Sequence, residues 1–135
     1  MSPELEMVLR LLLAVAMGGL IGLERQHAKK PAGLRTHVLV CIGAALFTIA
    51  SIYGFGEGSD PARVAAGVVA GIGFLGAGTI IRTPEGILVG LTTASSIWAV
   101  AAIGLVAGAG LYILTPVATL LMLIVLRLPK WIGGE

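Results

Sequence analysis

Charged residues are scarce in this sequence. Only 12% of its 135 residues are Asp, Glu, Lys or Arg, whereas about a quarter of an average soluble domain is charged. Because 57% of the residues are hydrophobic, nine basic and seven acidic side chains are too few to cover a folded domain with a polar surface. An ordinary soluble globule, a disordered chain and a nucleic-acid-binding domain are therefore excluded. The composition predicts an integral membrane protein.

Cysteine and recognisable catalytic groups are also scarce. Cys41 is the single cysteine, which excludes an intramolecular disulfide framework and any zinc or iron–sulfur site built from several cysteines. It lies in an apolar run, so we interpret it as a small buried hydrophobic residue. No nucleophile–base pair or adjacent carboxylate pair occurs at a spacing that catalysis would require. We therefore expect neither an enzyme nor a resident cofactor.

Apolar runs of suitable length recur along the whole chain. A helix needs about 20 mostly apolar residues to cross a hydrocarbon layer of roughly 30 Å. The sequence predicts an all-α fold: one transmembrane domain over residues 1–135, a polytopic bundle of five helices with glycine-rich packing. The expected helices cover residues 4–23, 34–53, 61–81, 87–107 and 111–126.

The basic residues divide unequally between the two ends of such a bundle. Cytoplasmic loops carry an excess of Lys and Arg, so the more basic end is expected inside the cell, with the N-terminus outside and the C-terminus cytoplasmic. The two sets are Arg25, Lys29, Lys30, Arg35, Arg82, Arg127 and Lys130 on one side, and Arg10 and Arg63 on the other.

Glycines at four-residue spacing predict where helices approach one another closely, since hydrophobicity cannot hold helices together in lipid. The segment 67–78 is the richest, and we expect it at the centre of the bundle. Its Gly71-x-Gly73-x-x-Gly76 pattern formally matches a dinucleotide-binding fingerprint, but an apolar helix is the wrong context for one. The expected packing positions are Gly18, Gly22, Gly67, Gly71, Gly73, Gly76, Gly78, Gly104 and Gly108.

Two charges oppose the dipoles of their own helices. Glu24 falls near the C-terminal end of the first expected helix, and Arg35 falls at the N-terminal end of the second. A Glu24–Arg35 ion pair would relieve both. A structural latch is the favoured interpretation, with participation in an ion or partner site as the alternative.

A second charged group is expected at the opposite end. Asp60 precedes Pro61 and predicts a helix N-cap, with Arg63 following in the first turn. Arg10 lies inside the first apolar run and needs a partner or a hydrated cavity. Asp60 and Glu57 are the nearest acidic candidates at that end, with Glu6 one helical turn earlier. We predict a cluster of Arg10, Asp60 and Arg63 at the outer mouth, serving as an interhelical clasp or as a functional vestibule.

Hydroxyl and imidazole groups complete the polar inventory. Thr92 and Thr93 belong to a hydroxyl-rich run over residues 92–96, which is expected to bond to helices or to line a hydrated path for a cation. His27 and His37 are expected to be solvated or interfacial, because the loop supplies too few further ligands for a metal site.

Five stretches in a fixed order resemble the MgtC/SapB family of bacterial inner-membrane proteins. The resemblance implies a multi-pass protein of the bacterial inner membrane that takes part in magnesium homeostasis. For members in pathogens it also implies intracellular survival and restraint of the F-type ATP synthase. The stretches are GLER at 22–25, KPAGLRTH at 30–37, DPAR at 60–63, GIGFLGAG at 71–78 and GLTTA at 90–94.

The resemblance also suggests binding residues and two functions. The first is a membrane regulator that docks on another membrane complex, such as the F-type ATP synthase. The second is a transporter or channel for Mg²⁺, in which case Mg²⁺ is the ligand or transported ion and an oligomer pools the ligands. We expect a homodimer and a short form without the soluble C-terminal domain of longer members. The binding positions taken from the motifs are Glu24, Arg25, Arg35, Thr36, Asp60, Arg63, Thr92 and Thr93.

Overall fold

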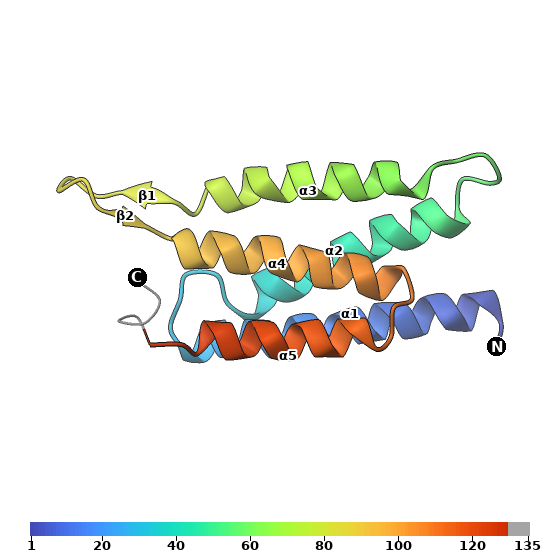
Figure 1. The fold of residues 1–135 in the computed structure, drawn as a ribbon, viewed down its shortest axis with the longest axis horizontal. Coiled ribbons are helices and arrows are strands. Elements are labelled where there is room, and N and C mark those ends of the chain that lie inside the picture. Colours follow the sequence, from blue (N-terminus) through green and yellow to red (C-terminus); the bar gives the residue numbers. More distant parts are fainter. Residues whose placement is uncertain (130–135) are drawn as a thin grey trace.

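The computed structural model describes residues 1–129, which fold into five α-helices and one short antiparallel hairpin (Figure 1). The expected all-α fold class is confirmed. The helices are α1 (Pro3–His27), α2 (Leu34–Tyr53), α3 (Pro61–Ala77), α4 (Leu91–Gly108) and α5 (Leu114–Leu126), and the strands are β1 (Ile81–Arg82) and β2 (Leu88–Val89).

Side-chain caps followed by proline fix the starts of two helices. The Leu5 N–H donates to Ser2 Oγ at 3.2 Å at the start of α1. The Ala62 N–H donates to Asp60 Oδ1 at 3.0 Å at the start of α3, so the Asp60 cap is confirmed. In both cases the proline occupies a first-turn position whose missing N–H would have had no partner within the helix.

A hairpin replaces two expected helix ends. These are the end of the helix expected at 61–81 and the start of the helix expected at 87–107. Ile81 pairs with Val89 and Arg82 with Leu88. The turn between them closes through the Thr83 N–H, which donates to the Ile87 carbonyl at 2.8 Å. The apolar, β-branched residues here suit strands as well as helices, so hydropathy alone did not separate the two.

Other boundaries moved by a few residues. The first helix continues past 23 to His27, and its last turn carries Arg25, a cation that the C-terminal helix dipole favours. The fifth begins at Leu114 instead of 111, because Gly110 at φ +84° turns the chain just before it.

Three of the described helices, α1, α2 and α4, are long and apolar enough to cross a membrane, while α3 and α5 are shorter and also apolar. Large apolar side chains face outward, including Leu12 at 57%, Phe47 at 63% and Val125 at 62% exposure. Such a surface suits lipid rather than water. The connections alternate between the two ends of the bundle, with the N-terminus at one end and the α1–α2 loop and the hairpin at the other (Figure 1).

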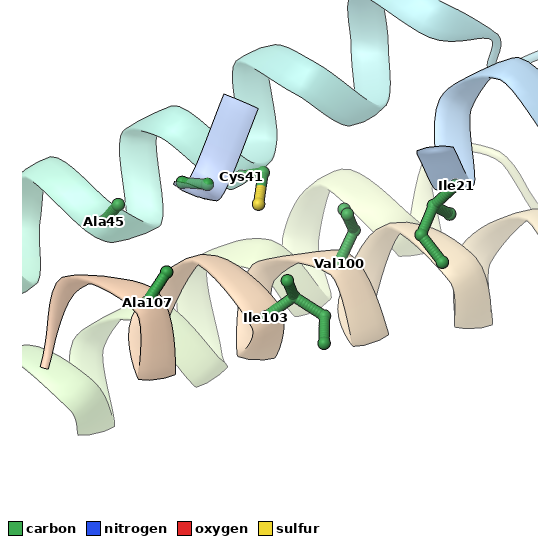
Figure 2. Close-up of a cluster of buried hydrophobic side chains, with 7 residues drawn as sticks. Ile21, Cys41, Ala45, Val100, Ile103 and Ala107 are labelled. Carbon is green, nitrogen blue, oxygen red and sulfur yellow. The ribbon is translucent and has the colours of Figure 1, made fainter. Parts of the chain in front are cut away.

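The core lies where α1, α2 and α4 meet, and small residues let their backbones approach. A Cβ added at Gly18 would lie 2.7 Å from Cys41 Cβ, and one added at Gly108 would lie 2.7 Å from the Ala45 carbonyl oxygen. Cys41 is 0% exposed, as its position in an apolar run predicts. Figure 2 shows the cluster around it, in which Ile21, Cys41, Ala45, Val100, Ile103 and Ala107 are labelled; Ala14 completes it.

The expectation that 67–78 forms the central helix is wrong. Within α3 only Gly76 is buried, and a Cβ added at Gly67, Gly71 or Gly73 would meet nothing within 4 Å. The central position belongs to α4, because its Gly104 lies directly against the Cys41 carbonyl of α2. Glycine content shows which helices allow close approach, but it does not show which of them is approached.

Candidate functional site

Arg25 forms a buried ion pair near the end of α1. The residue is 2% exposed, and its Nη2 lies 2.6 Å from Glu24 Oε1. Nη2 also donates to the Leu126 carbonyl at the end of α5, at 3.3 Å. Position 25 lies on the same helix face as the buried Gly18 and Ile21, because residues seven and four apart stack along a helix. Arg25 therefore links α1 to α5 from a shielded position.

The guanidinium is not fully satisfied by its neighbours. Arg25 Nη1 is buried and has no hydrogen-bond partner among the described residues. Its other two nitrogens are engaged, with Nε donating to Glu24 Oε1 at 2.7 Å and Nη2 bonded as described above. A buried donor without a partner costs free energy of folding. Arg25 Nη1 can therefore still donate a hydrogen bond at this end of the bundle.

The expected Glu24–Arg35 ion pair is wrong, because Glu24 pairs with its chain neighbour Arg25. Arg35 and Thr36 are exposed on the first turn of α2. The start of α2 is instead held by Gln26 of α1, whose Oε1 accepts from the Leu34 N–H at 3.1 Å. This amide performs part of the latch role that the sequence assigned to the charged pair.

His37 is buried, contrary to the expectation of a solvated or interfacial position. It is 0% exposed. Its Nδ1 lies 2.8 Å from the Gly33 carbonyl, and its Nε2 lies 2.9 Å from Ser96 Oγ on α4. The signal that sequence reasoning missed is spacing: His37 precedes the buried Cys41 by one helical turn, so both face α4. His27 is exposed, as expected.

A cavity of about 400 Å³ opens between α1, α4 and α5, and Ser96, the hydrogen-bond partner of His37, lines it. Its α4 wall carries the hydroxyls of Thr92, Ser95 and Ser96, and apolar side chains such as Ile21 form the opposite walls. Ser95 Oγ donates to the Leu91 carbonyl at 2.8 Å, which leaves its oxygen lone pairs free to accept. The cavity can therefore accept hydrogen bonds on one side and contact apolar groups on the other.

The opposite end of the bundle contains a second cluster, centred on Arg10. Arg10 Nη2 lies 3.1 Å from Glu6 Oε1, and Nη1 donates to the Gly108 carbonyl at 2.9 Å. Tyr112 donates its hydroxyl to Glu6 Oε1 at 2.7 Å, while the Tyr53 ring lies 5.2 Å from the guanidinium carbon. This cluster ties α1 to α2 and to the α4–α5 connection.

Tyr112 acts as a neutral donor in this cluster. Desolvation and its hydrogen bond to the Glu6 carboxylate raise the pKa of the Tyr112 phenol above its usual value of 10.0. The charge of Glu6 is thereby shared between a cation and a phenol.

The expected cluster of Arg10, Asp60 and Arg63 is wrong. Asp60 caps α3, and Arg63 is exposed in the first turn of that helix. Arg10 finds its acidic partner one turn earlier on its own helix, at Glu6. An i, i+4 pair needs no help from a distant loop, which explains why Arg10 does not need Asp60.

The eight positions taken from motifs therefore separate in space. Glu24, Arg25, Thr92 and Thr93 lie on α1 and α4 at the end that carries the hairpin, where Thr93 is 3% exposed and Thr92 lines the cavity. Arg35 and Thr36 are exposed at the α1–α2 connection, and Asp60 and Arg63 are exposed at the opposite end. Among residues 1–129, no group of three or more His, Cys, Asp or Glu side chains is placed to hold a metal ion.

Comparison with known proteins identifies relatives over nearly the whole chain. "Putative magnesium transporter YhiD" of Escherichia coli K12 is 50% identical over 129 residues, which cover 90% of this chain and 60% of the relative. "Protein MgtC" of Brucella abortus is 50% identical over 113 residues, covering 83% of this chain and 46% of the relative. A Haemophilus influenzae protein of uncharacterised function is 42% identical over 127 residues, covering 88% and 53%.

The chain thus spans about half the length of the curated relatives that it matches. No solved structure matches it significantly. The MgtC family matches residues 11–134, which include every helix except the first turns of α1. Together with the apolar helices, this match shows that the chain belongs to the MgtC family of membrane proteins.

Proposed function

We propose that this protein is a membrane regulator linked to magnesium homeostasis that acts by docking on another membrane protein. Membership of the MgtC family and the name of the 50% identical E. coli relative support the link to magnesium. The observation that carries the docking role is the open face of α3.

That face combines glycine backbone with apolar side chains such as Val68 and Ile72. Gly67 and Gly71 of α3 have open space where a side chain would lie, as does Gly43 of α2. These three glycines line a hollow of about 630 Å³ between α2 and α3. In lipid, helices associate where small residues let backbones approach closely. The occupant that we propose is a transmembrane helix of a partner protein.

The F-type ATP synthase is the first partner to test, because the family resemblance implies it. A second copy of this chain is the competing occupant, since symmetric dimers are the commonest oligomers. Crosslinking in native membranes from a photoreactive residue at position 67 distinguishes them by the mass of the product. Products that contain only this chain would contradict docking on a different protein.

A leucine at Gly71 tests the face directly. We expect Gly71→Leu to abolish the heterologous crosslink, because the new side chain enters the hollow from a position where an added Cβ would meet nothing within 4 Å. Ala102→Leu places the same side chain at an exposed position of α4 and should leave the crosslink intact. Equal loss in both variants would contradict a specific face on α3.

We propose that the protein lies in the bacterial inner membrane with its N-terminus outside. The support is the number of basic residues at the end that carries the α1–α2 loop and the hairpin, including Lys29, Lys30 and Arg82. Reporter fusions after Lys29 and Glu57 should report opposite sides, with Lys29 inside.

A Mg²⁺ transporter that works as an oligomer is the second candidate. The hydroxyl-lined cavity beside the Glu24–Arg25 pair favours it, because Mg²⁺ and its bound waters seek oxygen ligands. Mg²⁺ uptake into proteoliposomes that Glu24→Gln reduces and Arg63→Ala leaves unchanged would support this candidate over docking alone.

A further inference from the structure

The hydroxyl of Ser96 lies between two possible hydrogen-bond acceptors, and it has only one hydrogen to donate. Ser96 Oγ is 2.9 Å from His37 Nε2 and 2.9 Å from the Thr93 carbonyl oxygen. A carbonyl can only accept a hydrogen bond, whereas an imidazole nitrogen donates or accepts according to its protonation. The hydroxyl hydrogen can point at only one of the two.

The other imidazole nitrogen is fixed. His37 Nδ1 lies 2.8 Å from the Gly33 carbonyl oxygen, so it must carry a hydrogen to make that bond. In neutral imidazole Nε2 is then unprotonated and accepts from Ser96, which leaves the Thr93 oxygen without this donor. In the imidazolium Nε2–H donates to Ser96 Oγ, and Ser96 donates onward to Thr93. All three short contacts are hydrogen bonds at once only in the charged form.

The charges that act on His37 have opposite signs. The charged groups that act on it are Arg25 and Glu24 of α1, and they are paired with each other at 2.6 Å. Neither α4, which supplies Ser96, nor α5 contains an ionisable residue. On α2 itself, Arg35 is exposed and the Cys41 thiol lies one turn further along. A proton at Nε2 therefore meets an ion pair rather than an isolated like charge.

We propose that His37 Nε2 is a proton-binding site. Its protonation changes how the Ser96 hydroxyl can hydrogen-bond in the cavity between α1, α4 and α5. Proton uptake places a hydrogen on Nε2 and turns the Ser96 hydrogen from His37 to the Thr93 carbonyl. Ser96 lines the cavity. Its oxygen has both lone pairs available when His37 is neutral and only one when Nε2–H donates to it. A hydrogen-bond donor in the cavity therefore competes with the proton.

This proposal can be tested by imidazole ¹⁵N spectra of the full chain in lipid nanodiscs. The spectra are recorded between about pH 5 and 9, a range that contains the normal titration of histidine. We expect His37 to change from a neutral ring protonated at Nδ1 to an imidazolium within this range. Ser96→Ala should lower the midpoint by about one pH unit, because a hydrogen bond from a charged donor is stronger than the neutral bond lost with it.

Two controls separate the hydroxyl from its surroundings. Ser95→Ala removes a hydroxyl from the same wall, bonded to Leu91 instead, and should leave the midpoint unchanged. Ser96→Thr keeps the hydroxyl and should restore the wild-type midpoint if Ser96→Ala acts through hydrogen bonding. A His37 ring that stays neutral throughout this pH range would overturn the proposal. So would equal midpoints in wild type and Ser96→Ala.

Discussion

Arg10 donates to the carbonyl oxygen of Gly108 at 2.9 Å, a contact that joins residues 98 positions apart. That carbonyl belongs to the last residue of α4, where helix carbonyls have no partner within the helix. The cation also suits the negative end of the α4 dipole. One side chain thus terminates the central helix and anchors it to α1.

Replacing this side chain should loosen the end of the bundle that lies opposite the hairpin. We expect Arg10→Met to lower the free energy of unfolding by about 1–2 kcal/mol, because the Gly108 carbonyl loses its donor. Thermal unfolding in detergent measures the effect. Arg63→Met, at an exposed arginine near the same end, is the control and should have little effect. Equal destabilisation by both substitutions would contradict the assigned role.

The Glu24–Arg25 pair should behave as a coupled unit. Arg25→Met leaves a carboxylate whose side chain is only 8% exposed without its partner, so we expect a loss of about 3 kcal/mol. Glu24→Gln in the same chain should recover part of that loss, since the unpaired charge is gone. A double-mutant cycle followed by unfolding measures this coupling. Strictly additive effects would show that the two side chains do not depend on each other.

Glycines on α4 and α3 should respond differently to the same substitution. Gly104→Ala places a methyl group against the Cys41 carbonyl of α2, and overpacking of this kind typically costs about 1–3 kcal/mol. Gly67→Ala adds the same group where nothing lies within 4 Å. It should be neutral or slightly stabilising, because alanine favours a helix more than glycine does. The melting temperatures of the two variants measure this difference in stability.

High pH should weaken the Arg10 cluster through Tyr112. The pKa of this phenol is raised in the folded chain above its usual 10.0, so the folded state favours the protonated phenol. The stabilisation is fully present below the unfolded value and is lost as the pH rises through the folded one. Tyr112→Phe should therefore differ most from wild type near neutral pH and least in strong alkali. An unfolding series against pH in detergent measures this difference, and a constant gap would contradict it.

The sequence predicted the fold class well because hydropathy and length depend on local composition. The five apolar runs, the buried Cys41 and the Asp60 cap all follow from neighbouring residues. The hairpin at 81–89 did not, because a short apolar run does not by its periodicity distinguish a strand from a buried helix.

The polar groups were harder to predict because their partners are set by rotation of each helix about its axis. The position of Glu24 at the negative end of its helix dipole correctly indicated that it needs a partner. That partner is its chain neighbour Arg25. The four-residue spacing of His37 and Cys41 carried the information that His37 is buried. Its partner Ser96 could not be chosen among the hydroxyls of 92–96 without the relative rotation of α2 and α4.

The loose attachment of α3 has a consequence for how such proteins diversify. Because its glycines touch so little of their own chain, substitutions along its outer side carry a small folding penalty. The α1–α2–α4 framework is held by backbone contacts that tolerate almost no added bulk. Under the docking role proposed above, altering this single peripheral helix would change the partner while the framework stays as it is.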